Sequence, residues 1–113
     1  MSRFSKIGGE MVPHGRVEEA LHEAIGGDSL VFAVTAAQDS RKGESLIVLQ
    51  TCPAGRIPEI LAKLKEMGLP NPFIPRADRF VAVDAIPLLG TGKIALSEVK
   101  RIAMEKLTAV REL

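Results

Sequence analysis

Two continuous apolar runs constrain the fold more than any other part of the sequence. Residues 30–37 read LVFAVTAA, and residues 45–50 read SLIVLQ. Apolar runs of this length that are rich in β-branched residues are typical of strands buried on both faces of a sheet. The polar segment between them, residues 38–44, is short enough to join two antiparallel strands as a hairpin. We therefore expect each of these strands to be buried on both faces or to lie in the middle of a sheet.

Three other segments show helical patterns. Residues 13–25 begin with a proline, which suits the first turn of a helix, and are followed by a pair of glycines that end it. Residues 57–67 repeat large apolar residues at helical spacing, with Pro58 in the first turn and Gly68 as the stop. The last helix is predicted to begin near Ser97, a good N-cap, and to run towards the C-terminus.

Shorter elements complete the fold. Residues 3–12 contain two extended pieces around Gly8 and Gly9, a pattern that suits a small hairpin. The proline-rich residues 69–75 predict a rigid extended connector, and residues 79–83 predict a short third strand. The element order predicts an α+β fold, in which about three helices cover a small antiparallel sheet with a short N-terminal hairpin.

The composition excludes several classes of function. A chain of 113 residues with 46% hydrophobic and 26% charged residues is typical of one ordinary globular domain, residues 1–113. Its formal net charge of +1 and its lack of Trp and Tyr argue against a nucleic-acid surface. No apolar run is long enough to span a bilayer, and the N-terminus lacks the apolar core of a signal peptide. The single Cys52 suits a reducing compartment, so we predict a cytoplasmic location.

The histidines and the single cysteine predict no metal site. His14 and His22 are too far apart for an i,i+4 pair of ligands, and no cluster of cysteines or carboxylates completes a site. We assign both histidines to solvated or capping roles.

One loop stands out as a candidate functional site. The run AIPLLGTGKI places Lys93 at the tip of a glycine-flanked loop between a predicted strand and the last predicted helix. Gly90 and Gly92 can both adopt positive φ, and a lysine there is a mobile point charge suited to a phosphate or carboxylate oxygen. The loop departs from the phosphate-binding pattern G-x-x-x-x-G-K-[ST], because Pro87 replaces the first glycine and Ile94 replaces the hydroxyl residue. Taken alone, it is more typical of a surface turn with a solvated lysine.

A second motif changes this interpretation. The run KIGGE, residues 6–10, and the run PLLGTGKI, residues 87–94, resemble two motifs of the C-terminal domain of the acyl-adenylate-forming superfamily, the AMP-dependent synthetases and ligases. This superfamily includes acyl-CoA synthetases, luciferases and the adenylation domains of peptide synthetases. The resemblance covers nearly the whole chain, including Asp39 and residues 43–44 between the central strands. The run FSKIGGEMVPH, residues 4–14, looks most like the bacterial acyl-carrier-protein synthetase and 2-acylglycerophosphoethanolamine acyltransferase branch, which acts on long-chain fatty acids.

The resemblance implies a two-step reaction. A carboxylate attacks the α-phosphate of ATP to give an acyl-adenylate and pyrophosphate, and a thiol of CoA or of phosphopantetheine then takes the acyl group. Lys93 matches the family's lysine for the first step, where a cation stabilises the charge that develops on oxygen. The loop that supports it comprises Pro87, Gly90, Thr91 and Gly92. ATP or AMP, with Mg²⁺, would be bound mainly by the family's large domain.

The resemblance also implies a second working face. After the first step the small domain rotates on the large domain and withdraws the lysine. The face that it then presents carries the pantetheine-facing residues Lys6, Gly8, Gly9 and Glu10. Counting back from Lys6, the hinge falls at Ser2, where the family usually has Asp or Lys. The arginine that often follows the family's lysine is replaced here by residues 95–97.

We therefore expect a lid domain without the large N-terminal adenylation domain, and we expect it to be inactive alone. Its expected partners are that large domain and an acyl carrier protein or CoA, with no nucleic acid and no transmembrane segment. Membrane association of a full-length parent stays open. The alternative is a stand-alone, non-catalytic module that docks a carrier protein or a separate ligase subunit. An acidic carrier would find Arg3, Lys6, Arg16 and Lys93, although the near-neutral net charge gives this little support.

Overall fold

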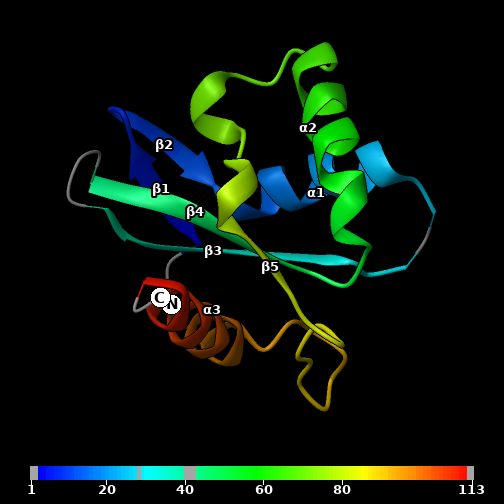
Figure 1. Cartoon of the computed structure of the whole chain (residues 1–113), viewed down its shortest axis with the longest axis vertical. Helices are drawn as coiled ribbons and strands as arrows, with labels where there is room; N and C mark the ends of the chain where they lie inside the picture. The colour runs from blue at the N-terminus through cyan, green and yellow to red at the C-terminus, as the bar shows by residue number, and fades with distance from the viewer. Residues whose placement is uncertain (1–2, 28, 40–42, 112–113) are drawn as a thin grey trace.

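The chain folds into a five-stranded sheet with helices on both faces (Figure 1). The structure is a computed structural model that describes residues 3–27, 29–39 and 43–111. The strands are β1 (Phe4–Ile7), β2 (Glu10–Pro13), β3 (Phe32–Asp39), β4 (Gly43–Gln50) and β5 (Phe80–Ala82). The helices are α1 (His14–Ile25), α2 (Ile57–Glu66) and α3 (Leu96–Arg111), and short 3₁₀ turns lie at Ala54–Arg56, Asn71–Phe73 and Ala77–Arg79. The predicted α+β class is confirmed.

The strands follow the order β2-β1-β4-β3, and β5 also pairs with β4. Strands β3 and β4 are antiparallel along their whole length, from the pair Phe32↔Gln50 to the pair Asp39↔Gly43, which confirms the predicted central hairpin. The N-terminal hairpin of β1 and β2 is also confirmed. Strand β5 runs parallel to β4, so the sheet is mixed and the antiparallel expectation holds only for β1 to β4. The connection from β4 to β5 runs through α2 and the 3₁₀ turns and returns the chain only as far as Val48, so β5 lies beside the last three residues of β4.

Alternating side chains on the central strands form two separate hydrophobic cores. Phe32 and Val34 of β3 pack in the core beneath α1 and α2, whereas Ala33, which lies between them, packs in the core beneath α3. Figure 1 shows α1 and α2 on one side of the sheet and α3 on the other. The expected burial of both strands on both faces is confirmed. Of these two, only β4 lies in the middle of the sheet, because β3 is an edge strand. The turn of the hairpin and the tip of the loop before α3 lie outside both cores and are exposed.

In the part of the chain that the structure describes, side chains cover the outer edge of β3. Val34 donates its N–H to Glu18 Oε2 (2.8 Å), and its carbonyl accepts from Arg3 Nη2 (3.1 Å). Arg3 and Glu18 form a bidentate ion pair, with Nη1 3.1 Å from Oε1 and Nη2 bonded to Oε2. Farther along the strand, the Ala36 carbonyl accepts from Lys100 Nζ. These bonds satisfy backbone groups that an open edge would offer to another chain.

The two histidines are structural, which corrects the expectation that they could be solvated. His14 is 5% exposed, and its Nε2 lies 2.6 Å from Ser5 Oγ in a hydrogen bond. Burial lowers the pKa of His14 below its ordinary value, because the charged form would lose hydration. His22 Nε2 accepts the N–H groups of Val31 (3.0 Å) and Phe32 (3.1 Å). His22 therefore does cap an element, but the element is β3 and not a helix.

The structure differs from two local expectations. The connector over residues 69–75 is not fully extended, because it contains the 3₁₀ turn at Asn71–Phe73. Proline fixes φ but leaves ψ free, so its presence did not distinguish a tight turn from an extended chain. Helix α3 begins at Leu96, and the Ala95 carbonyl accepts the first helical N–H at 3.0 Å. Ala95 is therefore the N-cap, and Ser97 lies inside the first turn.

Candidate functional site

The loop between β5 and α3 is closed by its own backbone. Leu89 N–H donates to the Lys93 carbonyl (2.7 Å), and Gly92 N–H donates to the Leu89 carbonyl (2.9 Å). Leu88 and Ile94 form an antiparallel bridge one step farther out. These bonds make the segment a miniature hairpin with Lys93 on its returning arm.

Both arms of this loop are anchored in the core beneath α3. Ile86 is buried and Ile94 is half-buried, and both pack against that core. At the base of the loop, Ala95 N–H donates to the Pro87 carbonyl (3.0 Å). The structure thus places Lys93 on the same anchored turn as the other predicted loop residues, which are Pro87, Gly90, Thr91 and Gly92.

Lys93 is exposed, and its ammonium group makes no hydrogen bond or ion pair with any residue that the structure describes. It is therefore available to an anion outside this chain. Two N–H groups of the turn, those of Leu89 and Gly92, already donate to carbonyls of the turn and so are not available to a phosphate. This geometry favours a loop that carries its lysine to an anion held elsewhere over a Walker-type loop.

The two glycines of the loop differ in what they require of the backbone. Gly92 has a φ of 90°, whereas Gly90 lies outside the left-handed region, so the expectation of positive φ holds at Gly92 alone of the two. An added Cβ would meet no atom within 4 Å at either position. A side chain would therefore strain the backbone at Gly92 but not at Gly90.

We expect Gly92→Ala to loosen the loop and Gly90→Ala to leave it nearly unchanged. A non-glycine residue in the left-handed region costs about 1–2 kcal/mol, which corresponds to roughly 5- to 30-fold faster local opening. Amide hydrogen exchange at Leu89, whose N–H closes the loop on the Lys93 carbonyl, measures this opening. Equal exchange rates in the two variants would contradict the prediction.

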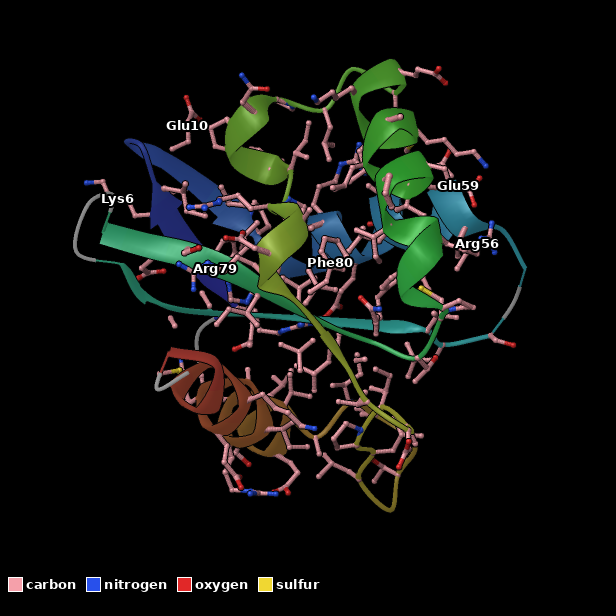
Figure 2. The ribbon with its side chains drawn as sticks, viewed as in Figure 1. Lys6, Glu10, Arg56, Glu59, Arg79 and Phe80 are labelled. Atoms are coloured by element: carbon pink, nitrogen blue, oxygen red, sulfur yellow. The ribbon has the colours of Figure 1, made fainter. Side chains whose placement is uncertain are left out.

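The second candidate group lies on the hairpin of β1 and β2. Gly8 and Gly9 form its turn with φ of 57° and 87°, as a two-residue turn between twisted strands requires. Lys6 and Glu10 are exposed on the two strands, and Figure 2 shows both side chains pointing away from the body of the domain. The hairpin therefore presents a cation, an anion and two positions without side chains at one end of the sheet.

The two groups do not come together. In Figure 1 the dark blue turn of the hairpin and the olive loop before α3 lie at opposite ends of the molecule. Their strands explain this separation, because β1 pairs with β4 at Gly43, whereas β5 pairs with residues 48–50 at the other end of β4. Lys6 and Lys93 therefore cannot contact the same small ligand within one domain. Ser2, the predicted hinge, lies outside the described residues.

The ion pair between Arg3 and Glu18 was not predicted from the sequence. Its partners are 15 residues apart and lie on different elements, so neither residue carries a local signal of the pairing. The pair attaches the first described residue of the chain to α1 and to the edge of β3. The segment that follows the predicted hinge is therefore joined firmly to the body of the domain.

A shallow groove of about 460 Å³ between α3 and the segment after β5 was also not predicted. Ile102 and Val83 form its apolar lining, and charged residues such as Arg101 and Glu105 stand at its rim. Arg101 donates hydrogen bonds to the carboxylates of Glu98 and Glu105, and its Nη1 lies 2.6 Å from Glu105 Oε2. Because these charges are already paired, we assign no ligand to the groove.

The described ranges contain neither a metal-binding cluster nor a membrane-spanning helix. No three His, Cys, Asp or Glu side chains there are arranged to hold a metal ion. No helix within those ranges combines the length and the apolar character needed to cross a bilayer.

Known structures resemble this fold, although no family model matches the sequence. MbtA from Mycobacterium smegmatis superposes with a TM-score of 0.72 at 25% identity, over 87% of this chain and 18% of that protein. A fatty acyl CoA synthetase from Mycobacterium tuberculosis gives 0.72 at 23% identity, over 88% and 19%. The K483A mutant of the amide bond synthetase McbA from Marinactinospora thermotolerans gives 0.71 at 22% identity, over 88% and 20%.

These similarities concern only part of each matched protein. The chain spans about a fifth of their lengths. Another neighbour, from Dyadobacter fermentans, is described as an AMP-forming acyl-CoA synthetase or AMP-acid ligase II-like protein. At such identities the comparison establishes the fold, and this fold is that of the C-terminal domain of acyl-adenylate-forming enzymes.

Proposed function

We propose that this chain is the C-terminal lid domain of an AMP-forming acyl ligase and that Lys93 is its adenylation lysine. The observation that carries the proposal is the position of Lys93. It lies on a loop that is closed by backbone bonds and anchored in the core, yet its ammonium group has no partner among the described residues. A scaffold that holds a free cation outward suits a site completed by another domain.

The proposed reaction places two anionic oxygens beside Lys93. ATP is a substrate here, and its α-phosphate is attacked by the carboxylate of the acid. As the bond forms, the carboxylate and the phosphate come together and charge builds up on the phosphate oxygens and on the departing pyrophosphate, so a cation beside them stabilises the transition state more than the ground state. This chain contributes the cation only. The nucleotide and Mg²⁺ would be held mainly by the large domain.

We assign the second half-reaction to the hairpin. In this assignment Gly8 and Gly9 let a pantetheine arm approach the backbone closely, because neither carries a side chain. Lys6 and Glu10 stand beside that path. The acceptor is CoA or a carrier protein, and we propose a long-chain fatty acid as the acid, on the basis of the run FSKIGGEMVPH. The separation of the hairpin from the loop before α3 supports a domain that turns between the two half-reactions (Figure 1).

The proposal is tested by joining the chain in frame to the large domain of an acyl-CoA synthetase from which the matching C-terminal region has been removed. Acid-dependent exchange of pyrophosphate into ATP reports adenylation. We expect exchange with the fusion and at most weak exchange with the large domain alone. Fusion activity no higher than that of the large domain would contradict the proposal. If the isolated chain instead binds a holo carrier protein tightly, the stand-alone module is the better interpretation.

A further inference from the structure

Exposed hydrophobic side chains gather beside the two candidate lysines. Among the described residues, the large hydrophobic side chains that are exposed are Phe4, Met11, Leu30, Met67, Leu88, Leu89 and Met104. Four of these seven belong to the hairpin or to the loop before α3. Single exposed apolar residues are common on any surface, but clusters of them indicate an interaction site.

On the hairpin, strand register puts the apolar residues on the same face as Lys6. Met11 lies directly opposite Lys6, and Phe4 lies two residues before it, so all three side chains share one face. Ser5 and Val12, which pair with each other between them, point to the other face and are buried. Phe4 is 52% exposed and Met11 is 57% exposed. Lys6 therefore stands within an apolar surface that no described element covers.

On the loop, the apolar residues adjoin Lys93 in the same way. Leu89 is held opposite Lys93 by the bond from its N–H to the Lys93 carbonyl, and Leu88 precedes it. Leu88 and Leu89 are each 52% exposed, whereas Ile86 and Ile94 of the same loop turn into the core. The loop thus uses two of its large apolar residues as anchors and leaves two in solvent.

Apolar residues beside a lysine can fix the position of its charge against a partner, which the flexible lysine side chain does not do by itself. A lysine side chain is flexible, so its charge is placed accurately only when the backbone beneath it is seated against the partner. Apolar contacts around the lysine also exclude water, which strengthens its interaction with an anionic oxygen. Leu88 with Leu89, and Phe4 with Met11, therefore have the apolar composition expected of a surface that positions a neighbouring lysine against a partner.

We propose that Leu88 and Leu89 are positioning residues that dock the Lys93 loop on the large adenylation domain, and that Phe4 and Met11 dock the Lys6 face on the same domain in the other half-reaction. This inference rests on the proposed function. The large domain is the occupant because the matched proteins carry about four-fifths of their length beyond the region that this chain covers. One partner with two alternative contacts also explains why the clusters lie at opposite ends of the molecule.

Serine substitutions in the fusion protein described above separate the two contacts. Leu88→Ser with Leu89→Ser should lower pyrophosphate exchange at least tenfold, while thiolysis of a supplied acyl-adenylate stays within about twofold of the unmodified fusion. Phe4→Ser with Met11→Ser should lower thiolysis of a supplied acyl-adenylate at least tenfold, while pyrophosphate exchange stays within about twofold of the unmodified fusion. Leu30→Ser with Met67→Ser is the matched control, because these residues are 40% and 38% exposed and lie on neither the hairpin nor the loop. Leu88→Met with Leu89→Met should restore exchange, because methionine keeps the apolar contact.

A second readout does not depend on activity. Hydroxyl-radical labelling of Leu88, Leu89, Phe4 and Met11 should be weaker in the fusion than in the isolated chain, with no change at Leu30 and Met67. The inference is overturned if each serine pair lowers both half-reactions equally, or if neither exceeds the control. Protection that appears in the isolated chain as it dimerises would also overturn it, because the occupant would then be a second copy. An inactive unmodified fusion would instead refute the proposed function, and this inference with it.

Discussion

Lys93→Ala is expected to lower the rate of acyl-adenylate formation by about a hundredfold or more, while thiolysis of supplied acyl-adenylate survives. Loss of one group that stabilises developing charge on oxygen typically costs a factor of that size. Thiolysis should be spared, because the loop before α3, which carries Lys93, lies at the opposite end of the domain from the hairpin that we assign to that step (Figure 1). Pyrophosphate exchange and thiolysis of added acyl-adenylate, measured on the same fusion protein, give the two rates separately.

Two further variants decide whether the effect belongs to this lysine. Lys65→Ala removes another exposed lysine, on α2, and should leave both rates unchanged. Lys93→Arg keeps the charge but replaces a compact ammonium by a planar guanidinium, so we expect only partial activity. An equal loss of both half-reactions in Lys93→Ala would refute the assigned role. A loss that Lys65→Ala reproduces would refute its specificity.

Glu18→Ala is expected to lower the free energy of unfolding of the isolated chain by about 3 kcal/mol. The substitution removes the partner of Arg3 and leaves the Val34 N–H at the edge of β3 without its acceptor. Breaking a buried ion pair from one side costs about 3–5 kcal/mol, and the lower end applies because the Arg3 side chain is 29% exposed. Urea denaturation measures the change, since the midpoint falls with stability.

The neighbouring Glu19 provides the control for this prediction. It lies on the same helix and is exposed, so Glu19→Ala should change stability by no more than about 0.5 kcal/mol. If Glu18→Ala were as mild as this control, the ion pair would be only a surface contact. Self-association of Glu18→Ala at high concentration would be consistent with exposure of the β3 edge.

The fold class and most of the elements could be predicted from the sequence because their signals are local. Apolar runs over residues 30–37 and 45–50 predicted the central strands, and helical spacing predicted α1 and α2. Glycine pairs marked the hairpin turn and the end of α1, since left-handed backbone is accessible to glycine at little cost. Gly92, which also has left-handed backbone, marked the turn of the loop that carries Lys93. The catalytic role of Lys93 stays a prediction.

Other features required contacts between distant parts of the chain. The parallel direction of β5 depends on how residues 51–79 leave the end of β4 and return beside Val48, and no residue of β5 encodes it. The cap of α3 is Ala95 because loop closure on Pro87 sets where the helix starts, which overrides the preference of Ser97 for that position.

Local sequence patterns encode the secondary-structure elements and the two motifs that carry Lys6 and Lys93. The surface around these motifs is set by the packing of the elements against one another. Apolar side chains that are close neighbours in the sequence differ in burial: Ile86 packs in the core and anchors the loop, whereas Leu88 and Leu89 are exposed. Arg3 and Glu18 became partners only when α1 packed beside β3. Burial and long-range pairing depend on the packing of whole elements, and a single sequence contains no local signal for either.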